Sequence, residues 1–458
     1  MLLFYEPRKH IHRLKFFHER SDFVINYLIC NNIKREPMLL LHLSDIHFRL
    51  DEINTPMDPN RHLRNELVMD ARDMCRKLGK SPSAILISGD IAFAGHPEEY
   101  KFALTWLETL AQECGTNIES VFVIPGNHDV VRKTAGRPIV QMLHNTIKQS
   151  PPFARDGQMR SLLMDEETSH PLYSSLDEFN SFAVQFFCDV KAPLRTIATR
   201  DLRMNDGSIL RLNGLNSALV SSHADKKGDL YVDPACFQIA RERGVEHVVL
   251  CHHPFTWLGH GEELKSHLND VARIQLFGHE HSSRIELQDD TVRIAASAAH
   301  PDRVEPGWEP GYNLLEVSIG SSNSGERELD IAAHIRIWQS TPGQFRAKMR
   351  RNDDVYRKKI PLESWAPTAQ SVITSNNESM PLSKIPDSAS DPMDNLRNVS
   401  IKFFKLTLSQ KSAIAGKLGL LEEEDRDQPD FERFRRVFIR ARDRGMIEEL
   451  EKEIRSIS

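Results

Sequence analysis

The sequence lacks several features that would place it in a specialised class of protein. Its six cysteines are scattered along 458 residues without a Cys-x-x-Cys pair, which argues against a disulfide framework and a structural zinc site. No apolar run approaches the roughly 20 residues that a membrane-spanning helix needs. Residues 1–20 carry charges too early for a secretion signal. These absences predict a cytoplasmic protein with reduced thiols.

The chain also lacks a large excess of positive or negative charge. The formal net charge is −6, so the overall charge does not attract nucleic acid or an anionic membrane, although a local basic groove stays compatible with it. In contrast, 40% of the residues are hydrophobic, which is enough for a sizeable core. A chain of 458 residues has room for two or three domains.

Residues 38–130 alternate between two kinds of pattern. Short apolar runs begin at Met38, at Ala84 and at Val121, and each ends in a polar loop. Between the last two runs, residues 98–114 carry apolar side chains at helical spacing. This alternation predicts an α/β sheet that is buried on both faces.

Residues 131–205 break this rhythm and predict a helical insertion. Its clearest element is one amphipathic helix with Phe179, Phe182, Phe186 and Phe187 along an apolar face. Strands are predicted to resume after the insertion, at 209–215, 245–250, 274–277 and 291–296, with a closing antiparallel pair at 312–319 and 331–338.

The chain divides into four predicted parts. Residues 1–37 show no helix or strand period and predict an extension, consistent with a mistaken start codon. The main domain covers residues 38–345, and a linker rich in Pro, Ser and Asn follows over 346–394. Residues 395–458 carry two apolar stripes at helical spacing and predict a separate all-α unit.

Five polar clusters follow apolar runs of the main domain. Strand residues two apart point to the same side, so Asp45 with His47 and His279 with His281 are predicted to converge in pairs. Strand ends of an α/β sheet meet at one edge, where ligands bind. A single His-x-His is expected about once by chance in a chain of this composition, and His10 with His12 supplies one that we assign no role. The clusters are Ser44-Asp45-Ile46-His47, Ser88-Gly89-Asp90, Gly126-Asn127-His128-Asp129, His252-His253-Pro254 and Gly278-His279-Glu280-His281.

This ordered set resembles the signature of the calcineurin-like metallophosphoesterases, over about residues 38–340. The resemblance implies an α/β (α+β) fold, a four-layer β-sandwich of two mixed sheets flanked by helices. It also implies two divalent metal ions bridged by Asp90. One ion would take Asp45, His47 and His281, and the other would take Asn127, His252 and His279. His252 rather than His253 matches the family position two before Pro254, which leaves His253 a supporting role.

The remaining residues of the third cluster are predicted to assist catalysis. His128 is placed to donate a proton or to stabilise the transition state, and Asp129 is expected to orient His128. Asn216 and Ser217 resemble a recurrent stretch of the family, but an ordinary turn at a strand end explains them equally well.

The predicted ligands also favour particular metals and substrates. Carboxylate, imidazole and amide groups suit Mn, Fe or Zn rather than Cu(I) or Ca, and we expect Mn first. Two divalent ions against two aspartates and a bridging hydroxide leave positive charge for an anionic phosphoryl group. The predicted reaction is hydrolysis of a phosphodiester, either a cyclic nucleotide or a nucleic acid, by metal-activated hydroxide. The alternatives are a phosphoprotein or phosphomonoester phosphatase and a non-catalytic scaffold of the same fold.

The tail carries a second, weaker resemblance. Residues 403–445 resemble death-fold-like, effector-associated helical domains of bacteria, which link enzymes to NTPase or sensor proteins in signalling or defence. This implies a protein partner for residues 395–458. Within the tail, Arg433, Arg436, Arg440 and Arg444 fall on one helix face, which is either a docking surface or a solvated face neutralised by nearby acids.

Overall fold

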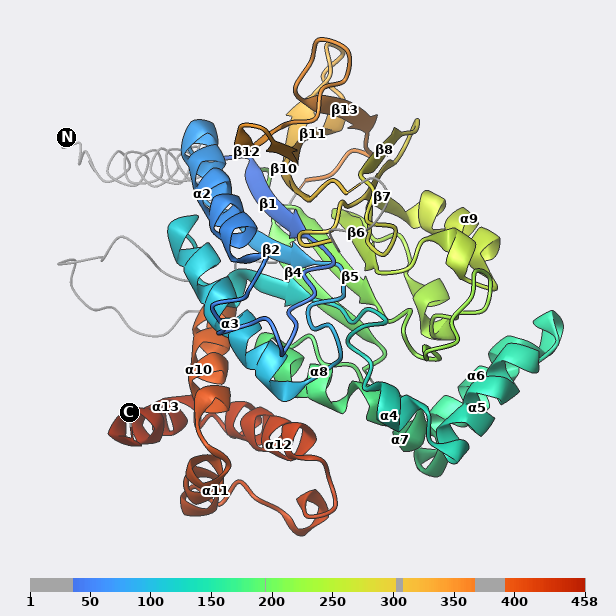
Figure 1. The fold of residues 1–458 in the computed structure, drawn as a ribbon, viewed down its shortest axis with the longest axis vertical. Coiled ribbons are helices and arrows are strands. Elements are labelled where there is room, and N and C mark those ends of the chain that lie inside the picture. The colour runs from blue at the N-terminus through green and yellow to red at the C-terminus, as the bar shows by residue number, and fades with distance from the viewer. Residues whose placement is uncertain (1–35, 194, 302–307, 367–391, 458) are drawn as a thin grey trace, which may run out of the picture.

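The computed structural model describes residues 36–193, 195–301, 308–366 and 392–457 of the chain. The predicted extension, apart from its last two residues, and the central part of the predicted linker (367–391) lie outside this part. The described residues form a body of two β-sheets and outer helices, with a smaller group of helices beside it (Figure 1). None of the described helices is long and apolar enough to cross a membrane.

The first sheet contains three parallel strands and four antiparallel ones. Its parallel strands are buried along their whole length, which is why they appear in the sequence as continuous apolar runs. In spatial order the strands are β12 (Gly343–Ala347), β11 (Arg327–Ser340), β10 (Gly311–Ser321), β1 (Met38–Leu43), β2 (Ala84–Ile87) and β3 (Val121–Val123), and β13 (Tyr356–Pro361) also pairs with β11.

The second sheet packs face to face against the first. Gly214 of this sheet lies so close to β3 that an added Cβ would come 2.5 Å from the Cγ2 atom of Ile124. The two sheets share one hydrophobic core, and both are mixed, so the predicted sandwich of mixed sheets is confirmed. In spatial order the strands are β4 (Ile197–Arg203), β5 (Ile209–Leu215), β6 (Val245–Cys251), β7 (Ala272–Phe277), β9 (Val292–Ala295) and β8 (Arg284–Leu287).

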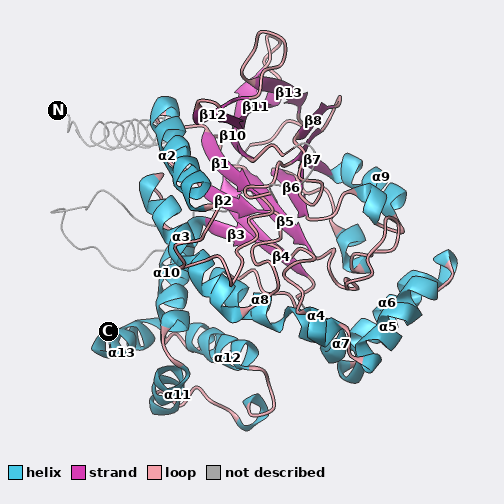
Figure 2. Cartoon of the chain, viewed as in Figure 1, coloured by secondary structure: helices cyan, strands magenta, loops and turns pink. Residues whose placement is uncertain are grey.

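Helices cover the outer sides of the sheets (Figure 2). Helices α2 (Arg61–Leu78) and α3 (Pro97–Glu113) lie beside the first sheet, and α9 (Gly261–Val271) packs against β6 and β7. Helix α3 begins with a capping box, in which the His96 side chain accepts from the backbone of the first turn while the Glu99 carboxylate accepts from the His96 N–H. Glu99 is buried and also accepts the N–H groups of Phe93 and Ala94. The start of α3 therefore holds the loop that follows β2.

The segment predicted as a helical insertion contains five helices and one strand. Helices α5 and α6 extend away from the two sheets (Figure 1), whereas β4 joins the second sheet and was not predicted. The helices are α4 (Arg132–Ala135), α5 (Pro138–Gln149), α6 (Pro152–Met164), α7 (Glu166–Tyr173) and α8 (Asp177–Ala183).

The predicted phenylalanine helix is wrong in its second half. Helix α8 ends at Ala183 and a 3-10 turn follows, so Phe179 and Phe182 lie in the helix but Phe186 does not. Phe187 adopts a left-handed backbone with φ 57° and turns toward the C-terminal helices, where its ring lies 5.8 Å from that of Phe438. Its apolar side chain therefore belongs to a second core, which helical periodicity does not show.

The C-terminal helices form this second core. They are α10 (Pro392–Lys405), α11 (Leu408–Lys417), α12 (Asp430–Asp443) and α13 (Ile447–Ile457). This unit docks on the main body through ion pairs as well as through Phe187. Arg195 donates to Glu432 at 2.5 Å, and Arg435 pairs with Asp189 at 3.1 Å. The predicted linker begins later than expected, because β13 is hydrogen-bonded to β11 and so extends the main sheet to Pro361.

Candidate metal centre

Five loops bring the predicted site residues together. They follow β1, β2 and β3 of the first sheet and β6 and β7 of the second. The carboxyl ends of these strands therefore supply the side chains from both halves of the sandwich. The loops carry Asp45 and His47, then Asp90, then Asn127 and His128, then His252, then His279 and His281.

The backbone of these loops explains how the side chains converge. Strand alternation was the wrong reason for the predicted pairs, because Asp45, His47, His279 and His281 lie beyond the strand ends. Asp45, His47, Asp90, His279 and His281 all have φ between 51° and 70°. Non-glycine residues rarely adopt this left-handed region, and such strain gathers at functional sites.

One group of ligand atoms lies around Asp45. Its Oδ1 atom is 3.2 Å from His281 Nε2 and 3.7 Å from His47 Nε2. The same His47 nitrogen is 3.7 Å from Asp90 Oδ2. Both ring nitrogens of His47 are buried and lack a hydrogen-bond partner among the described residues, as expected of an imidazole placed to ligate a metal.

A second group lies around Asn127. Its Oδ1 atom is 3.1 Å from His252 Nε2 and 3.0 Å from His279 Nδ1. His252 Nε2 is also 3.2 Å from Asp90 Oδ2, so the Asp90 carboxylate lies between the two groups. The ligand atoms of Asp45, His47 and His281 lie within 4.8 Å of one another, and so do those of Asp45, Asp90 and His252. The donor set and its spacing fit two divalent ions that share Asp90.

The electrostatics of the metal-free protein point to the same position. Burial favours the neutral forms of both groups, but Asp90 raises the pKa of His252 to about 9. Burial alone would raise the pKa of Asp90, but His252 holds this pKa well below its usual range. At neutral pH His252 therefore carries a proton beside the ionised carboxylate of Asp90. A divalent cation bound there would displace this proton.

Glycines allow the loops to approach so closely. A Cβ added to Gly126 would lie 2.2 Å from Asp90 Oδ1, and one added to Gly89 would lie 2.6 Å from His252 Nδ1. Contacts under 3.0 Å are not found for real Cβ atoms. The glycines of these two motifs are therefore required by the packing around Asp90 and His252.

His128 lies beside this cluster with one ring nitrogen engaged. Its backbone N–H donates to Asp90 Oδ1 at 2.8 Å, and its Nδ1 atom lies 2.8 Å from the carbonyl oxygen of Phe93. The Phe93 ring packs against the imidazole at 4.9 Å. These contacts fix the orientation of the ring. No local sequence signal identified Phe93, which lies 35 positions away.

The predicted orientation of His128 by Asp129 is corrected by the structure. Asp129 is buried, and its carboxylate accepts the backbone N–H groups of Ile91, Ala92 and Gly126. Tyr100 donates its hydroxyl to the same carboxylate at 2.9 Å. Asp129 therefore ties the loop after β2 to the loop after β3, and the carbonyl of Phe93 has the role expected of it.

His253 packs behind the second group. Its Nδ1 atom lies 2.9 Å from the hydroxyl of Ser217, which also accepts the His253 backbone N–H. His253 forms a candidate ligand group with His252 and His279, and its buried Nε2 atom has no hydrogen-bond partner among the described residues. The Ser217 contact gives the Asn216-Ser217 stretch a role in holding this ring. His10 and His12 lie outside the described residues.

Comparison with known proteins agrees with this geometry. A model of the calcineurin-like phosphoesterases matches residues 38–283. The chain belongs to this family. Its members use a binuclear divalent metal centre, and the Asp/His clusters above provide the matching site. A model described as a GTPase-associated adaptor domain matches residues 395–456, which confirms that the phosphoesterase domain is followed by a helical adaptor domain.

Individual relatives match this chain either over a short segment or at low sequence identity. A glycerophosphodiester phosphodiesterase of Enterobacter lignolyticus is 35% identical over 97 residues, which cover 20% of this chain and 30% of that protein. Vps29 of Cryptosporidium parvum is a structural match at 10% identity, covering 72% of this chain and all of that one, with a TM-score of 0.31. GAP50 of Plasmodium matches at 10% identity over 72% of this chain and 90% of that one, with a TM-score of 0.36.

Proposed function

We propose that this phosphoesterase hydrolyses a phosphodiester, a cyclic nucleotide or a nucleic acid, at the cluster centred on Asp90. The observation that carries the proposal is the position of the Asp90 carboxylate between two groups of ligand atoms. All seven predicted ligands are present, whereas a non-catalytic scaffold would be expected to have lost one.

Each side chain has a defined task in this proposal. Asp45, His47 and His281 would hold one divalent ion, Asn127, His252 and His279 the other, and Asp90 would contact both. Manganese is the expected metal, with iron or zinc as alternatives. When bound, the two ions supply charge that acidifies a water molecule and neutralises phosphoryl oxygens.

His128 would act on the leaving group. Its Nδ1 atom is directed at the Phe93 carbonyl, so Nε2 is the atom that holds or gives up the proton. Burial lowers the pKa of this imidazole. The nearby Asp90 carboxylate and a bound phosphoryl group act in the opposite direction, because negative charge favours the protonated ring.

The phosphodiester class is favoured by one relative. The glycerophosphodiester phosphodiesterase of E. lignolyticus shares 35% identity over the matched 97 residues, although this chain spans less than a third of that protein. The net charge of −6 does not favour a long nucleic-acid groove. A cyclic nucleotide and a short stretch of nucleic acid therefore stay as the two candidate substrates.

The adaptor domain would couple hydrolysis to a protein partner, in a bacterial signalling or defence setting. All four arginines of the predicted stripe pair inside the domain, with Arg433 on Asp430 at 3.1 Å. Arg440 pairs with Asp425 at 2.5 Å, Arg444 with Glu422 at 2.7 Å, and Arg436 with Glu432 at 3.0 Å. These internal ion pairs favour the solvated-face interpretation of the stripe, so the partner surface is expected elsewhere on the domain.

The test compares a chromogenic phosphodiester with its monoester in the presence of Mn²⁺. Wild type is measured beside Asp90→Asn and beside Asp289→Asn, which changes an exposed turn residue as a matched control. We expect diester cleavage that is lost only in Asp90→Asn. Cleavage of the monoester alone would replace the proposal with a phosphatase. Absence of both activities from protein with measured bound metal would count against hydrolysis of simple esters.

A further inference from the structure

A cleft of about 1100 Å³ opens between the two domains, away from the candidate metal centre. Met38, Ser83 and Ser120 line it at the start of β1, β2 and β3, and helices α10 and α12 of the adaptor domain form the other wall. The metal ligands lie beyond the opposite, carboxyl ends of the same strands. The cleft and the metal centre are therefore at opposite ends of the first sheet.

The cleft is rich in one kind of charge. Two carboxylates line it, those of Glu119 and Asp201, against three times as many guanidinium groups. Arg211, Arg435 and Arg442 also pair with carboxylates. With the remaining guanidinium groups the cleft would attract an anionic molecule, although the net charge of the chain is negative. The arginines are Arg200, Arg203, Arg211, Arg397, Arg435 and Arg442.

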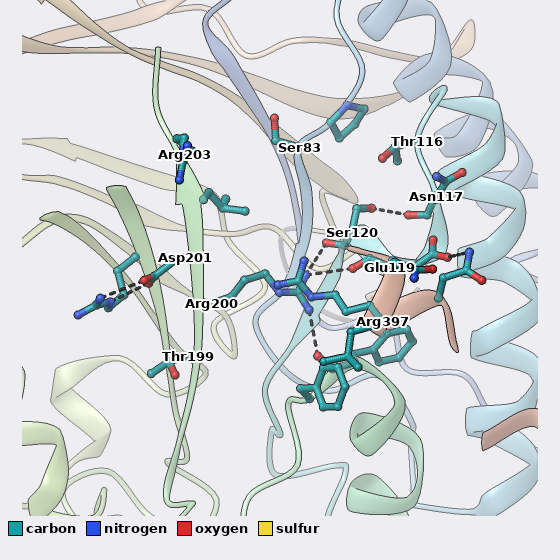
Figure 3. A pocket seen from close by; sticks show the side chains of 18 of the residues that line it. Ser83, Thr116, Asn117, Glu119, Ser120, Thr199, Arg200, Asp201, Arg203 and Arg397 are labelled. Carbon is teal, nitrogen blue, oxygen red and sulfur yellow. Dashed lines mark hydrogen bonds and ion pairs between the residues drawn. The ribbon is translucent and has the colours of Figure 1, made fainter. Parts of the chain in front are cut away.

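The floor of the cleft is held in place by both domains (Figure 3). Arg200 is only 5% exposed, and its guanidinium donates to the backbone carbonyls of Glu119, Ser120 and Phe186 at 3.0–3.3 Å. From the adaptor side, Asn398 donates to the Glu119 carboxylate at 2.6 Å. A charged side chain buried against carbonyl oxygens marks a structured site rather than a gap in loose packing.

Two exposed arginines, Arg203 and Arg442, form what we call the rim of the cleft, and apolar side chains form part of its wall. Arg203 on β4 is exposed and has no ion pair with another described residue, and Arg442 on α12 is exposed and pairs with its neighbour Asp443. Between them lie the half-buried side chains of Leu202, Leu396 and Ile439. The cleft thus combines guanidinium groups with an apolar wall.

We propose that this interdomain cleft binds a nucleotide, with its phosphates on the rim arginines and its base against the apolar wall. Guanidinium forks match phosphate oxygens in a bidentate geometry. The volume of about 1100 Å³ slightly exceeds the roughly 300–1000 Å³ of small-molecule sites, which leaves room for solvent around a mononucleotide. Because the ligand would touch both domains, its binding would favour the docked position of the adaptor.

The first experiment titrates ADP into the full chain by calorimetry. The variant Arg203→Gln/Arg442→Gln removes one rim charge from each domain, and Arg357→Gln/Arg455→Gln removes two exposed charges outside the cleft. Each lost charge-assisted contact is worth about tenfold in affinity. We expect weakening of about tenfold or more in the rim variant and unchanged affinity in the control.

A second arm separates the cleft from the metal centre. ADP binding is repeated in full-length Asp90→Asn, and diester hydrolysis is measured in the rim variant. The proposal expects ADP binding to be retained in Asp90→Asn and diester hydrolysis in the rim variant to equal that of wild type. The ADP arm tests the cleft by itself, so it stands if the protein hydrolyses no diester. Loss of ADP binding in Asp90→Asn, equal binding in rim and control variants, or no heat at about 1 mM ADP would overturn it. Binding of hexaglutamate without ADP would assign the cleft to an acidic protein segment instead.

Discussion

The hydroxyl of Tyr100 offers a clean test of how the metal-binding loops are held. It donates to Asp129, whose carboxylate also accepts backbone N–H groups from the loops after β2 and β3. Tyr100→Phe removes this one donor while keeping the ring that stacks on Phe182 at 5.3 Å. The variant should therefore loosen the loops without creating a cavity.

The size of the effect depends on the charge of Asp129. Burial and the neighbouring Asp90 raise the pKa of Asp129 to about 6, so its side chain is ionised at pH 8 and protonated at pH 5. A hydrogen bond to a charged group is worth about 1.5–3 kcal/mol, and one to a neutral group about 1 kcal/mol. Tyr100→Phe should lower the free energy of unfolding by about 2 kcal/mol at pH 8 and by about 1 kcal/mol at pH 5.

The pH dependence has a definite sign. Removing the hydroxyl raises the pKa of Asp129 further in the folded state but leaves it unchanged in the unfolded chain. The charge-dependent part of the stability contributed by the hydroxyl is therefore fully present above the raised folded pKa of the variant, and it is lost as the pH falls from there through the wild-type value of about 6.

Urea unfolding of the metal-free full chain at both pH values measures this difference. Tyr356→Phe is the matched control, since Tyr356 is buried in β13 and its hydroxyl has no hydrogen-bond partner among the described residues. With Mn²⁺ restored, metal affinity should fall by up to about tenfold, the low end for groups that support metal ligands. Equal destabilisation at pH 5 and pH 8, or unchanged metal affinity, would refute the role assigned to Asp129.

Three further predictions test other parts of the molecule. His128→Ala should keep its bound metal, measured by elemental analysis, while turnover falls by about 10²–10⁴-fold; unchanged turnover would remove His128 from the mechanism. Burial, and to a lesser extent the charge of Glu178, raises the pKa of Asp177 to about 7. The stability that the protonated Asp177 side chain contributes is therefore lost as the pH rises from about 4 through 7. Asp177→Asn should therefore gain thermal stability relative to wild type over this range, and a constant difference would contradict the assignment. Deletion of residues 395–458 should abolish partner capture and spare hydrolysis of small esters, whereas loss of hydrolysis would make the adaptor part of the catalytic fold.

The sequence indicated which polar residues the structure brings together beyond the strands, because these residues lie in short segments. Each ligand follows a buried strand directly, and a continuous apolar run such as β1 or β2 is visible without knowledge of its neighbours. The reason given for convergence was nevertheless wrong. The left-handed backbone at Asp45 and His279 depends on loop packing, which residue types alone do not show.

The features that the sequence analysis predicted wrongly depend on residues that lie far away in the sequence. Asp129 was assigned to the adjacent His128, but its side-chain partner Tyr100 lies 29 positions away. Strand β4 alternates only partly between buried and exposed residues and was hidden beside five helices. Phe187 continued a helical stripe in the sequence, yet its partner Phe438 lies in another domain.

The arginines of the C-terminal domain also show that helical periodicity does not identify the residues that contact the other domain. Helical periodicity selected Arg433, Arg436, Arg440 and Arg444, and acids of the adaptor itself pair with all four. The neighbouring Arg435 reaches the Asp189 carboxylate instead, and it lines the interdomain cleft. Asp189 follows the 3-10 turn after α8, and α8 carries Phe182, on which Tyr100 stacks. Arg435, one of the arginines that link the domains, therefore lies off the most regular stripe. Its partner Asp189 is joined to α8 along the chain, and α8 reaches the Asp129 tie through the stacking of Phe182 on Tyr100. If a shift of the adaptor acts on the loops of the metal centre through Tyr100, deletion of residues 395–458 should lower metal affinity in wild type but not in Tyr100→Phe, while hydrolysis at saturating metal is retained in both.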